Sequence, residues 1–194
     1  MVVTHSDGPG TETDADLIRQ AGGSPERFAA LFDRHYRHIY AYAARRLGGD
    51  LAEDVASETF LVAFDRRDGY DVGRADARPW LYGIASNLIA RHGRAETRRY
   101  QALARLGPDA HAEAHDDLVA GRIDAGGSRG LLARALQRLP QSERDVLLLV
   151  AWAGFSQQEA AVALDIPAGT ARSRLHRARQ EMRLALGAGP EGDQ

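Results

Sequence analysis

Apolar residues recur at three- and four-residue steps along most of this sequence, and the alternation that marks a β-strand is almost absent. Such spacing places apolar side chains on one face of a helix. The clearest series lies between a helix-start signal, Ser24–Pro25, and a helix-stop signal, Gly48–Gly49. Its members are Phe28, Leu31, Phe32, His35, Ile39, Tyr42 and Ala43. We therefore predict an all-α fold.

Two more helices are predicted before residue 106. Asp50 and Glu53 have the spacing of a capping box and predict a helix that runs to about Arg67. After a polar loop at residues 68–77, one long helix is expected over residues 78–105.

Residues 106–130 divide the chain. This segment holds five glycines, a proline and an excess of acidic residues, so it has little apolar surface to bury and predicts a flexible linker. We expect two small helical domains on either side of it, at residues 17–105 and 131–187. Residues 1–16 and 188–194 are expected to be disordered tails.

The net charge of −2 hides two basic segments. Residues 78–105 carry six arginines against one glutamate, and residues 172–183 carry five arginines against one glutamate. Two such segments predict two phosphate-binding surfaces. All 25 basic side chains are arginine, for which biased codon usage is the simplest explanation.

The sequence argues against several other classes of protein. Without cysteine the chain has no disulfide framework and no thiolate metal site. No apolar stretch approaches the roughly 18 residues that span a bilayer, and the polar, acidic start of the chain is unlike a signal peptide. Phosphate-binding glycine loops, nucleophile elbows and metal-ligand helix motifs are missing. We expect a cytoplasmic protein without enzymatic activity, metal, cofactor or membrane contact.

The second half predicts a helix that Ser142 and Asp145 cap, followed by a helix-turn-helix. Ser156 and Glu159 form a capping box before a short helix, and the turn Asp165–Ile166–Pro167 leads into an arginine-rich helix that ends near residue 186. The second helix of this motif lies in the major groove, with its N-terminal residues at the base edges. A solvated charged face is the alternative for its arginines. The residues expected to contact DNA are Thr170, Arg172, Ser173, Arg174, His176 and Arg177.

The first half contains residues suited to bind unpaired bases, in contrast to the duplex contacts predicted for the second half. Unpaired bases stack on aromatic rings within a basic groove. The residues that combine these properties are Tyr70, Arg78, Trp80, Arg91 and Arg94. Trp80 also shares a helix face with Ile84 and Leu88, so packing in the core is an equally good interpretation of this residue.

These motifs together resemble the extracytoplasmic-function (ECF) group of bacterial sigma factors. The run IPAGTARSRLHRAR is similar to the region 4 helix that reads the −35 promoter element, residues 28–64 resemble region 2, and residues 78–99 resemble the segment that opens the −10 element. A glycine is common in the family where Asp165 stands. The resemblance implies three partners: core RNA polymerase, through the clamp helices of its β′ subunit, promoter DNA, and an anti-sigma factor.

The resemblance also implies roles for individual residues. Asn87 corresponds to a reader of a base that is flipped out of the −10 element. The residues that match the polymerase-binding positions are Asp54, Glu58, Phe60 and Phe64. The competing hypothesis is a stand-alone helix-turn-helix regulator that does not bind polymerase. Such regulators usually dimerise on palindromic sites, whereas this chain combines its helix-turn-helix with a second domain that is basic and aromatic.

Overall fold

The computed structural model describes residues 12–105 and 127–187, here called the first half and the second half, and all regular structure in these ranges is helical. The first half contains α1 (Asp14–Gln20), the 3₁₀ turn η1 (Pro25–Arg27), α2 (Phe28–Leu47), α3 (Gly49–Asp65), the 3₁₀ turn η2 (Arg67–Gly69), α4 (Arg78–Arg91) and α5 (Gly93–Arg105). The second half contains α6 (Gly127–Arg138), α7 (Gln141–Trp152), α8 (Gln157–Ala163) and α9 (Ala168–Ala185). This confirms the predicted all-α fold. None of the helices in these two ranges has the length and apolar character to cross a bilayer.

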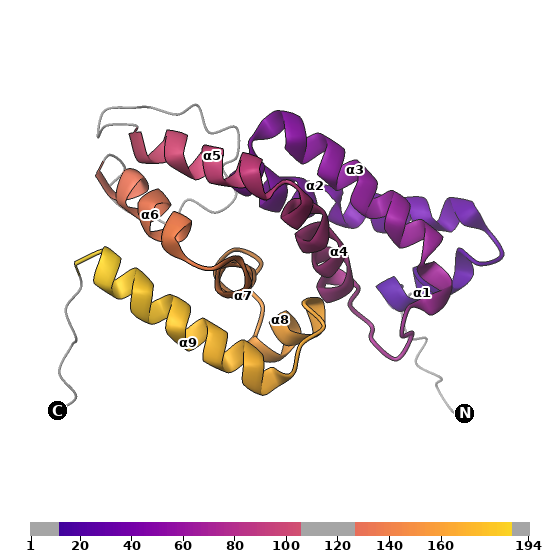
Figure 1. Cartoon of the computed structure of the whole chain (residues 1–194). Coiled ribbons are helices and arrows are strands. Elements are labelled where there is room, and N and C mark those ends of the chain that lie inside the picture. The colour runs from indigo at the N-terminus through magenta and orange to yellow at the C-terminus, as the bar shows by residue number, and fades with distance from the viewer. Residues whose placement is uncertain (1–11, 106–126, 188–194) are drawn as a thin grey trace, which may run out of the picture.

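Helix α4 lies at the centre of the molecule (Figure 1). On one side it packs against α2 and α3, and on the other against α7 and α8. Its apolar residues Leu81, Ile84, Leu88 and Ile89 are buried. Because α4 is apolar on nearly all sides, it requires cover from both halves of the chain.

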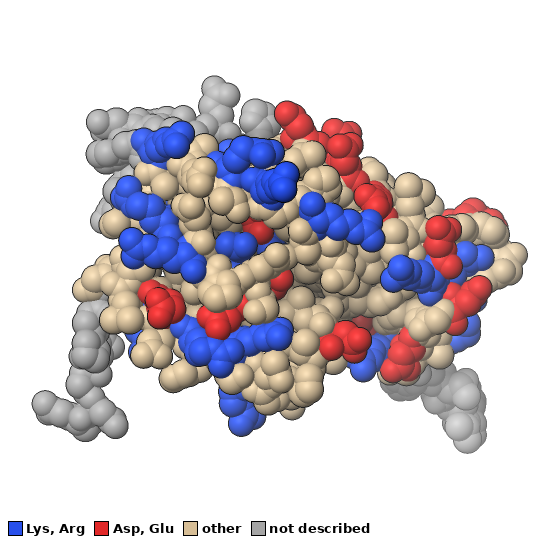
Figure 2. All heavy atoms as spheres, viewed as in Figure 1, with Lys and Arg blue, Asp and Glu red and all other residues tan. Residues whose placement is uncertain are grey.

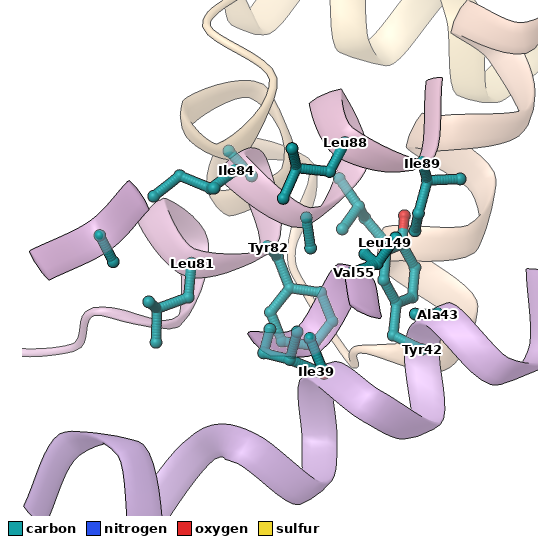
Figure 3. Packing of buried hydrophobic residues seen from close by; sticks show 14 of the residues in the cluster. Ile39, Tyr42, Ala43, Val55, Leu81, Tyr82, Ile84, Leu88, Ile89 and Leu149 are labelled. Atoms are coloured by element: carbon teal, nitrogen blue, oxygen red, sulfur yellow. The ribbon is translucent and has the colours of Figure 1, made fainter. Parts of the chain in front are cut away.

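The two halves share one hydrophobic core. Leu149 of α7 is fully buried and belongs to the same cluster as Ile39, Tyr42 and Val55 of the first half. Figure 3 shows Leu149 among the side chains of α2, α3 and α4. The helical units on either side of the predicted linker therefore lie in direct contact. Residues 106–126, most of the predicted linker, lie outside the described residues.

The long helix predicted over residues 78–105 is wrong. It is divided at His92, where φ is −97° and ψ is 23°, into α4 and α5. Gly93 follows directly and weakens the run at this point, because glycine is a poor helix former. The change of direction allows Glu96 and Tyr100 of α5 to reach the core, where both are buried.

Two of the predicted helix caps are also wrong. Helix α3 begins at Gly49 and ends at Asp65, and Gly48 at its start has φ of 93° with no side-chain cap, so Asp50 and Glu53 form no capping box. Helix α7 begins directly after Pro140, and a predicted cap of Ser142 with Asp145 does not form because Asp145 points into the core. In both cases the backbone at a glycine or proline sets the start of the helix.

Helix α1 begins inside the segment expected to be a disordered tail. Thr13 caps it in a capping box with Asp16, and its leucine and isoleucine are buried. Helix α6 likewise begins at Gly127, inside the predicted linker. Both boundaries were therefore misplaced by a few residues. The remaining tail residues, 1–11 and 188–194, lie outside the described residues.

Asp14 fixes α1 to the loop before α4. Its backbone N–H donates to the Ala75 carbonyl at 3.1 Å, and its carboxylate accepts the Ala77 N–H at 3.0 Å. His35 Nε2 lies 2.8 Å from the same carboxylate, and Arg34 donates to its other oxygen. Burial alone would raise the pKa of Asp14, but these hydrogen bonds outweigh it and lower the pKa to about 2.

Asp14→Asn preserves the shape of this side chain and removes its charge. Because the pKa is lower in the folded chain, the carboxylate stabilises the fold above pH 4, by about 2 kcal/mol, and loses this contribution as the pH falls through about 2. We expect the variant to be less stable at pH 7 by about this amount, with the difference shrinking toward pH 2. Urea unfolding at a series of pH values measures it. Asp33→Asn, on the exposed side of α2, is the control, and a pH-independent difference for Asp14→Asn would contradict the assignment.

Candidate nucleic-acid interface

The helix-turn-helix forms as predicted from α8 and α9. The Ser156 N–H donates to Glu159 Oε2 at 2.7 Å, and the Glu159 N–H donates to Ser156 Oγ at 3.2 Å, which confirms the capping box. Hydrogen bonds from the Ser156 backbone and side chain to the carboxylate lower the pKa of Glu159. Asp165 adopts a φ of 50°, and the Ile166 N–H closes the turn on the Ala161 carbonyl at 3.0 Å. Asp165 therefore takes the left-handed conformation that a glycine would adopt more easily.

A small core orients α9 on the rest of the motif. Val146 of α7, Ala161 of α8, and Ala171 and Leu175 of α9 are buried against one another. Small side chains at 161 and 171 allow the helices to approach closely. The buried stripe of α9 leaves its other faces to solvent.

All six residues predicted to read DNA lie on the first three turns of α9, on its outer side or at its edge. Thr170 and Arg174 are half-buried, and the remaining members are exposed: Arg172, Ser173, His176 and Arg177. The Ser173 hydroxyl already donates to the Thr170 carbonyl at 3.0 Å. In the part of the chain that the structure describes, Arg172 and Arg174 make no hydrogen bond or ion pair, so both are available to a ligand.

Arg177 differs from the other arginines of α9. Its Nε donates to Glu143 Oε1 of α7 at 2.6 Å, while the side chain remains 54% exposed. Glu143 is buried at its end of the pair. One edge of this guanidinium is therefore held by the protein, which orients the other edge outward.

The aromatic residues of the first half are arranged differently from the prediction. Tyr70 is buried, its ring centroid lies 4.9 Å from that of Trp80, and its hydroxyl donates to the Arg74 carbonyl at 2.6 Å. Burial raises the pKa of Tyr70 to about 12. Trp80 is half-buried, so it both packs and reaches the surface. Tyr70 supports Trp80 from the core and offers no free ring face in this arrangement.

Polar residues of α4 form an exposed stripe beyond Trp80. Asn87 and Arg91 are exposed and lie one turn apart on the same side of the helix. Arg91 Nη1 lies 3.3 Å from Glu58 Oε1 of α3, and Arg94 is exposed at the start of α5. Arg78, by contrast, is half-buried: it bonds Asp76 at 2.9 Å, and its guanidinium lies 5.6 Å from the ring centroid of Phe155 in the second half.

Helix α3 exposes an acidic and apolar stripe. Asp54 and Glu58 are exposed one turn apart, and Leu61 follows on the same side with 66% of its surface exposed. Acidic side chains gather over α3 in Figure 2, and basic ones over α5 and α6. Leu61 was missed by the sequence analysis, although its spacing of seven from Asp54 is a signal for a shared helix face.

The two phenylalanines of α3 lie on its inner side. Phe60 is only 4% exposed and packs edge-on against Phe32 with the ring centroids 4.9 Å apart. Phe64 is half-buried, 5.3 Å from Phe28, and Arg67 lies 4.2 Å from its ring centroid. Both rings therefore support the exposed stripe from beneath.

The described ranges contain no group of His, Asp and Glu side chains that is suited to hold a metal ion. The interface consists of arginines, an exposed amide, one half-buried indole and an acidic helix. Groups of these kinds are suited to bind phosphates, bases and a partner protein.

Comparisons with known proteins match this division. Residues 31–99 match the family described as Sigma-70 region 2, and residues 129–182 match Sigma-70, region 4. The ECF RNA polymerase sigma factor SigL of Mycobacterium tuberculosis is 33% identical over 159 residues, which cover 81% of this chain and 87% of the relative. SigW of Bacillus subtilis, also an ECF RNA polymerase sigma factor, is 31% identical over 171 residues, 84% and 91% of the two chains.

Two solved structures share the fold. CnrH in complex with the cytosolic domain of CnrY has a TM-score of 0.61 at 24% identity, covering 90% of this chain and 97% of that one. The sigma factor RpoE in complex with the anti-sigma factor NepR, from Bartonella quintana, has a TM-score of 0.59 at 24% identity, covering 82% and 96%.

Proposed function

The chain belongs to the ECF group of RNA polymerase sigma factors, and we propose that its two halves divide promoter recognition between them. As a sigma factor it is a DNA-binding initiation factor that directs RNA polymerase to promoters, and it is not an enzyme. A stand-alone regulator is not favoured, because both halves match sigma families: the first half matches region 2, and the second half matches region 4.

In this proposal α9 reads the −35 element. The supporting observation is that its first turns carry two unpaired arginines, Arg172 and Arg174, directly after the tight turn at Asp165 that follows α8. Arg174 is placed to reach base edges, and Arg177, oriented by Glu143, assists it. Arg179 and Arg183 lie further along the helix, where they contact phosphates.

The surface of α4 captures the −10 element. Asn87 reads an extruded base, Trp80 offers the exposed part of its ring, and Arg91 and Arg94 bind the backbone. Opening a few base pairs costs about 1.4 kcal/mol per step, and stacking recovers about 1–3 kcal/mol per base, so capture needs no nucleotide hydrolysis by this chain. Tyr70 contributes by supporting Trp80.

The exposed stripe of α3 binds core polymerase at the clamp helices of its β′ subunit. Asp54 and Glu58 supply charge and Leu61 an apolar contact, while Phe60 and Phe64 hold the helix rigid from beneath. The similar chains CnrH and RpoE were solved with CnrY and with the anti-sigma factor NepR. We infer an anti-sigma partner and a cytoplasmic location for this chain as well.

Charge reversal on α3 tests polymerase binding. Asp54→Arg with Glu58→Arg should reduce capture of core polymerase at least tenfold, because two cations replace two anions at the contact and cost more than about 1.4 kcal/mol. Pull-down at several salt concentrations measures the loss. The pair Glu26→Arg and Asp33→Arg, exposed acids elsewhere in the first half, should bind normally. Undiminished capture by the folded α3 variant would move the contact to another surface.

Two arginine variants separate base reading from phosphate binding. Arg174→Ala should weaken −35 binding by about 1–3 kcal/mol and relax the preference at one position. Arg183→Ala should weaken binding to all sequences alike and lower the salt dependence by about one unit. Both are measured by titrating a panel of singly substituted −35 duplexes. An unchanged preference at every position for Arg174→Ala would refute its assigned role.

Asn87→Ala should spare the closed promoter complex and impair opening. The expectation follows because Asn87 meets a base only after that base has left the duplex. Permanganate footprinting detects the open bases on a duplex promoter. A template that is already unpaired at −10 should restore transcription by the variant. If Asn87→Ala opens duplex promoters like the parent chain, base capture belongs to other residues.

A further inference from the structure

A pocket of about 310 Å³ lies where the end of α2, the start of α3 and α5 meet. Its volume is at the lower end of the range for small-ligand sites. The wall consists of Leu47, residues 48–51, Ala95, Arg98 and Arg99. All of these residues belong to the first half, and none belongs to the surfaces assigned above to the −10 element or to polymerase.

The two arginines of the pocket are unpaired. Arg98 is exposed and Arg99 is half-buried on α5, over which basic side chains gather in Figure 2. Within residues 12–105 and 127–187, neither takes part in a hydrogen bond or an ion pair. Both guanidinium groups therefore keep their charge and their donors for a ligand.

The Nε of Arg99 is buried without a hydrogen-bond acceptor in the described ranges. Arg67 and Arg144 also have a buried Nε of this kind, but another nitrogen of each group donates to a carbonyl oxygen. Arg99 lacks any such bond in these ranges. A Cβ added at Gly48 would lie 4.0 Å from this Nε, so the orphaned donor sits beside the start of α3. A buried donor without an acceptor is costly, and an anion in the pocket removes that cost.

The start of α3 supplies further donors to the pocket. Gly48 has a φ of 93°, no side chain caps the helix, and the N–H groups of residues 49–51 have no partner in the part of the chain that the structure describes. With 17 residues, α3 is long enough for its aligned peptide dipoles to favour an anion at this end. The Tyr40 hydroxyl lies close by, 3.8 Å from a Cβ added at Gly49.

The charge of the pocket wall favours a phosphate group as the ligand. Asp50 is the acid of the wall, and its side chain is exposed, whereas Arg98, Arg99 and the helix start are positive. The donors come from several directions. A phosphate group accepts hydrogen bonds at three or more oxygens and a carboxylate at two, so phosphate uses this set more fully.

We propose that this pocket binds a phosphate group, with Arg99 and the N–H groups at the start of α3 as its main donors and with Arg98 and Tyr40 at its rim. The phosphate belongs either to a small phosphorylated compound or to the backbone of promoter DNA, since both present the same chemistry. The second source is within reach because Arg94, assigned above to the DNA backbone, is one turn from Arg98 on α5.

Inorganic pyrophosphate is the probe for the first source. Added to the full-length chain, it should move the amide NMR signals of Gly49, Asp50 and Leu51 until they saturate, and sodium chloride at the same ionic strength should not. Arg99→Gln should raise the dissociation constant roughly tenfold, because a charged donor is lost. Arg66→Gln, an exposed arginine at the other end of α3, is the matched control and should bind like the parent.

Two further variants test the pocket without removing an arginine. Gly49→Pro deletes one backbone donor at the first helical position, where proline fits, and should weaken pyrophosphate binding. Asp50→Asn should strengthen it about twofold to fivefold, because a like charge at the helix start is removed. Asp65→Asn, an exposed acid at the far end of α3, is the control for this variant. Circular dichroism checks that every variant keeps its helices.

Binding of the holoenzyme to a promoter duplex at a series of salt concentrations tests the second source. If the DNA backbone is the ligand, Arg99→Gln should lower the salt dependence by about one unit, and Arg66→Gln should leave it unchanged. A loss in the pyrophosphate titration alone identifies a small compound as the ligand, and a loss in the salt series identifies DNA.

The proposal is overturned if the parent and Arg99→Gln respond alike to pyrophosphate and also show the same salt dependence on DNA. A parent holoenzyme that does not bind the promoter would refute the proposed function instead. The pyrophosphate titration alone then decides on the pocket, since it needs neither polymerase nor DNA.

Discussion

Arg46 is the constraint on which the rest of the architecture depends. A guanidinium with no exposed surface is costly to bury unless several acceptors surround it. Burial by itself would lower its pKa, but Tyr42, Asp145 and Glu96 outweigh that effect and raise it. Glu96 reaches Arg46 only because the chain turns at His92. Asp145 reaches it only because α7 packs against the first half, so one cation determines the course of α5 and the position of α7.

Sequence reasoning succeeded where structure is decided by neighbours along the chain. The capping box of Ser156 and Glu159 and the turn at Asp165–Ile166–Pro167 involve residues within five positions of one another, and both were predicted. It failed at Asp145, which has the spacing of a cap with Ser142 but bonds Arg46, 99 positions away. A local pattern does not reveal that a distant buried cation needs the same carboxylate. The contact between the halves was unpredictable for the same reason.

In the candidate site, too, sequence reasoning succeeded for some helix faces and failed for others. The exposed side of α9 was predictable because the buried alanines and leucine of that helix leave only one broad surface for its arginines. Helix α3 has apolar residues on adjoining stripes, and the sequence does not say which stripe packs inward. The structure buries Phe60 and exposes Leu61, because Phe32 and Tyr36 of α2 receive the phenylalanine ring. Tyr70 was displaced from the surface by its bond to the Arg74 carbonyl.

Gly83 connects these observations, because its residue type is explained by packing and not by helix formation. Glycine inside a helix costs about 1 kcal/mol relative to alanine, and the three atoms nearest to a Cβ added at position 83 of α4 all belong to Ala163 of α8, with its carbonyl oxygen at 2.2 Å. The contact that excludes a side chain comes from the α8 backbone. Helix α4, which carries the proposed −10 surface, thus has a residue of low helix propensity at the point where the second half packs on it. The glycine at position 83 therefore fits the packing of α8 on α4 that the structure shows.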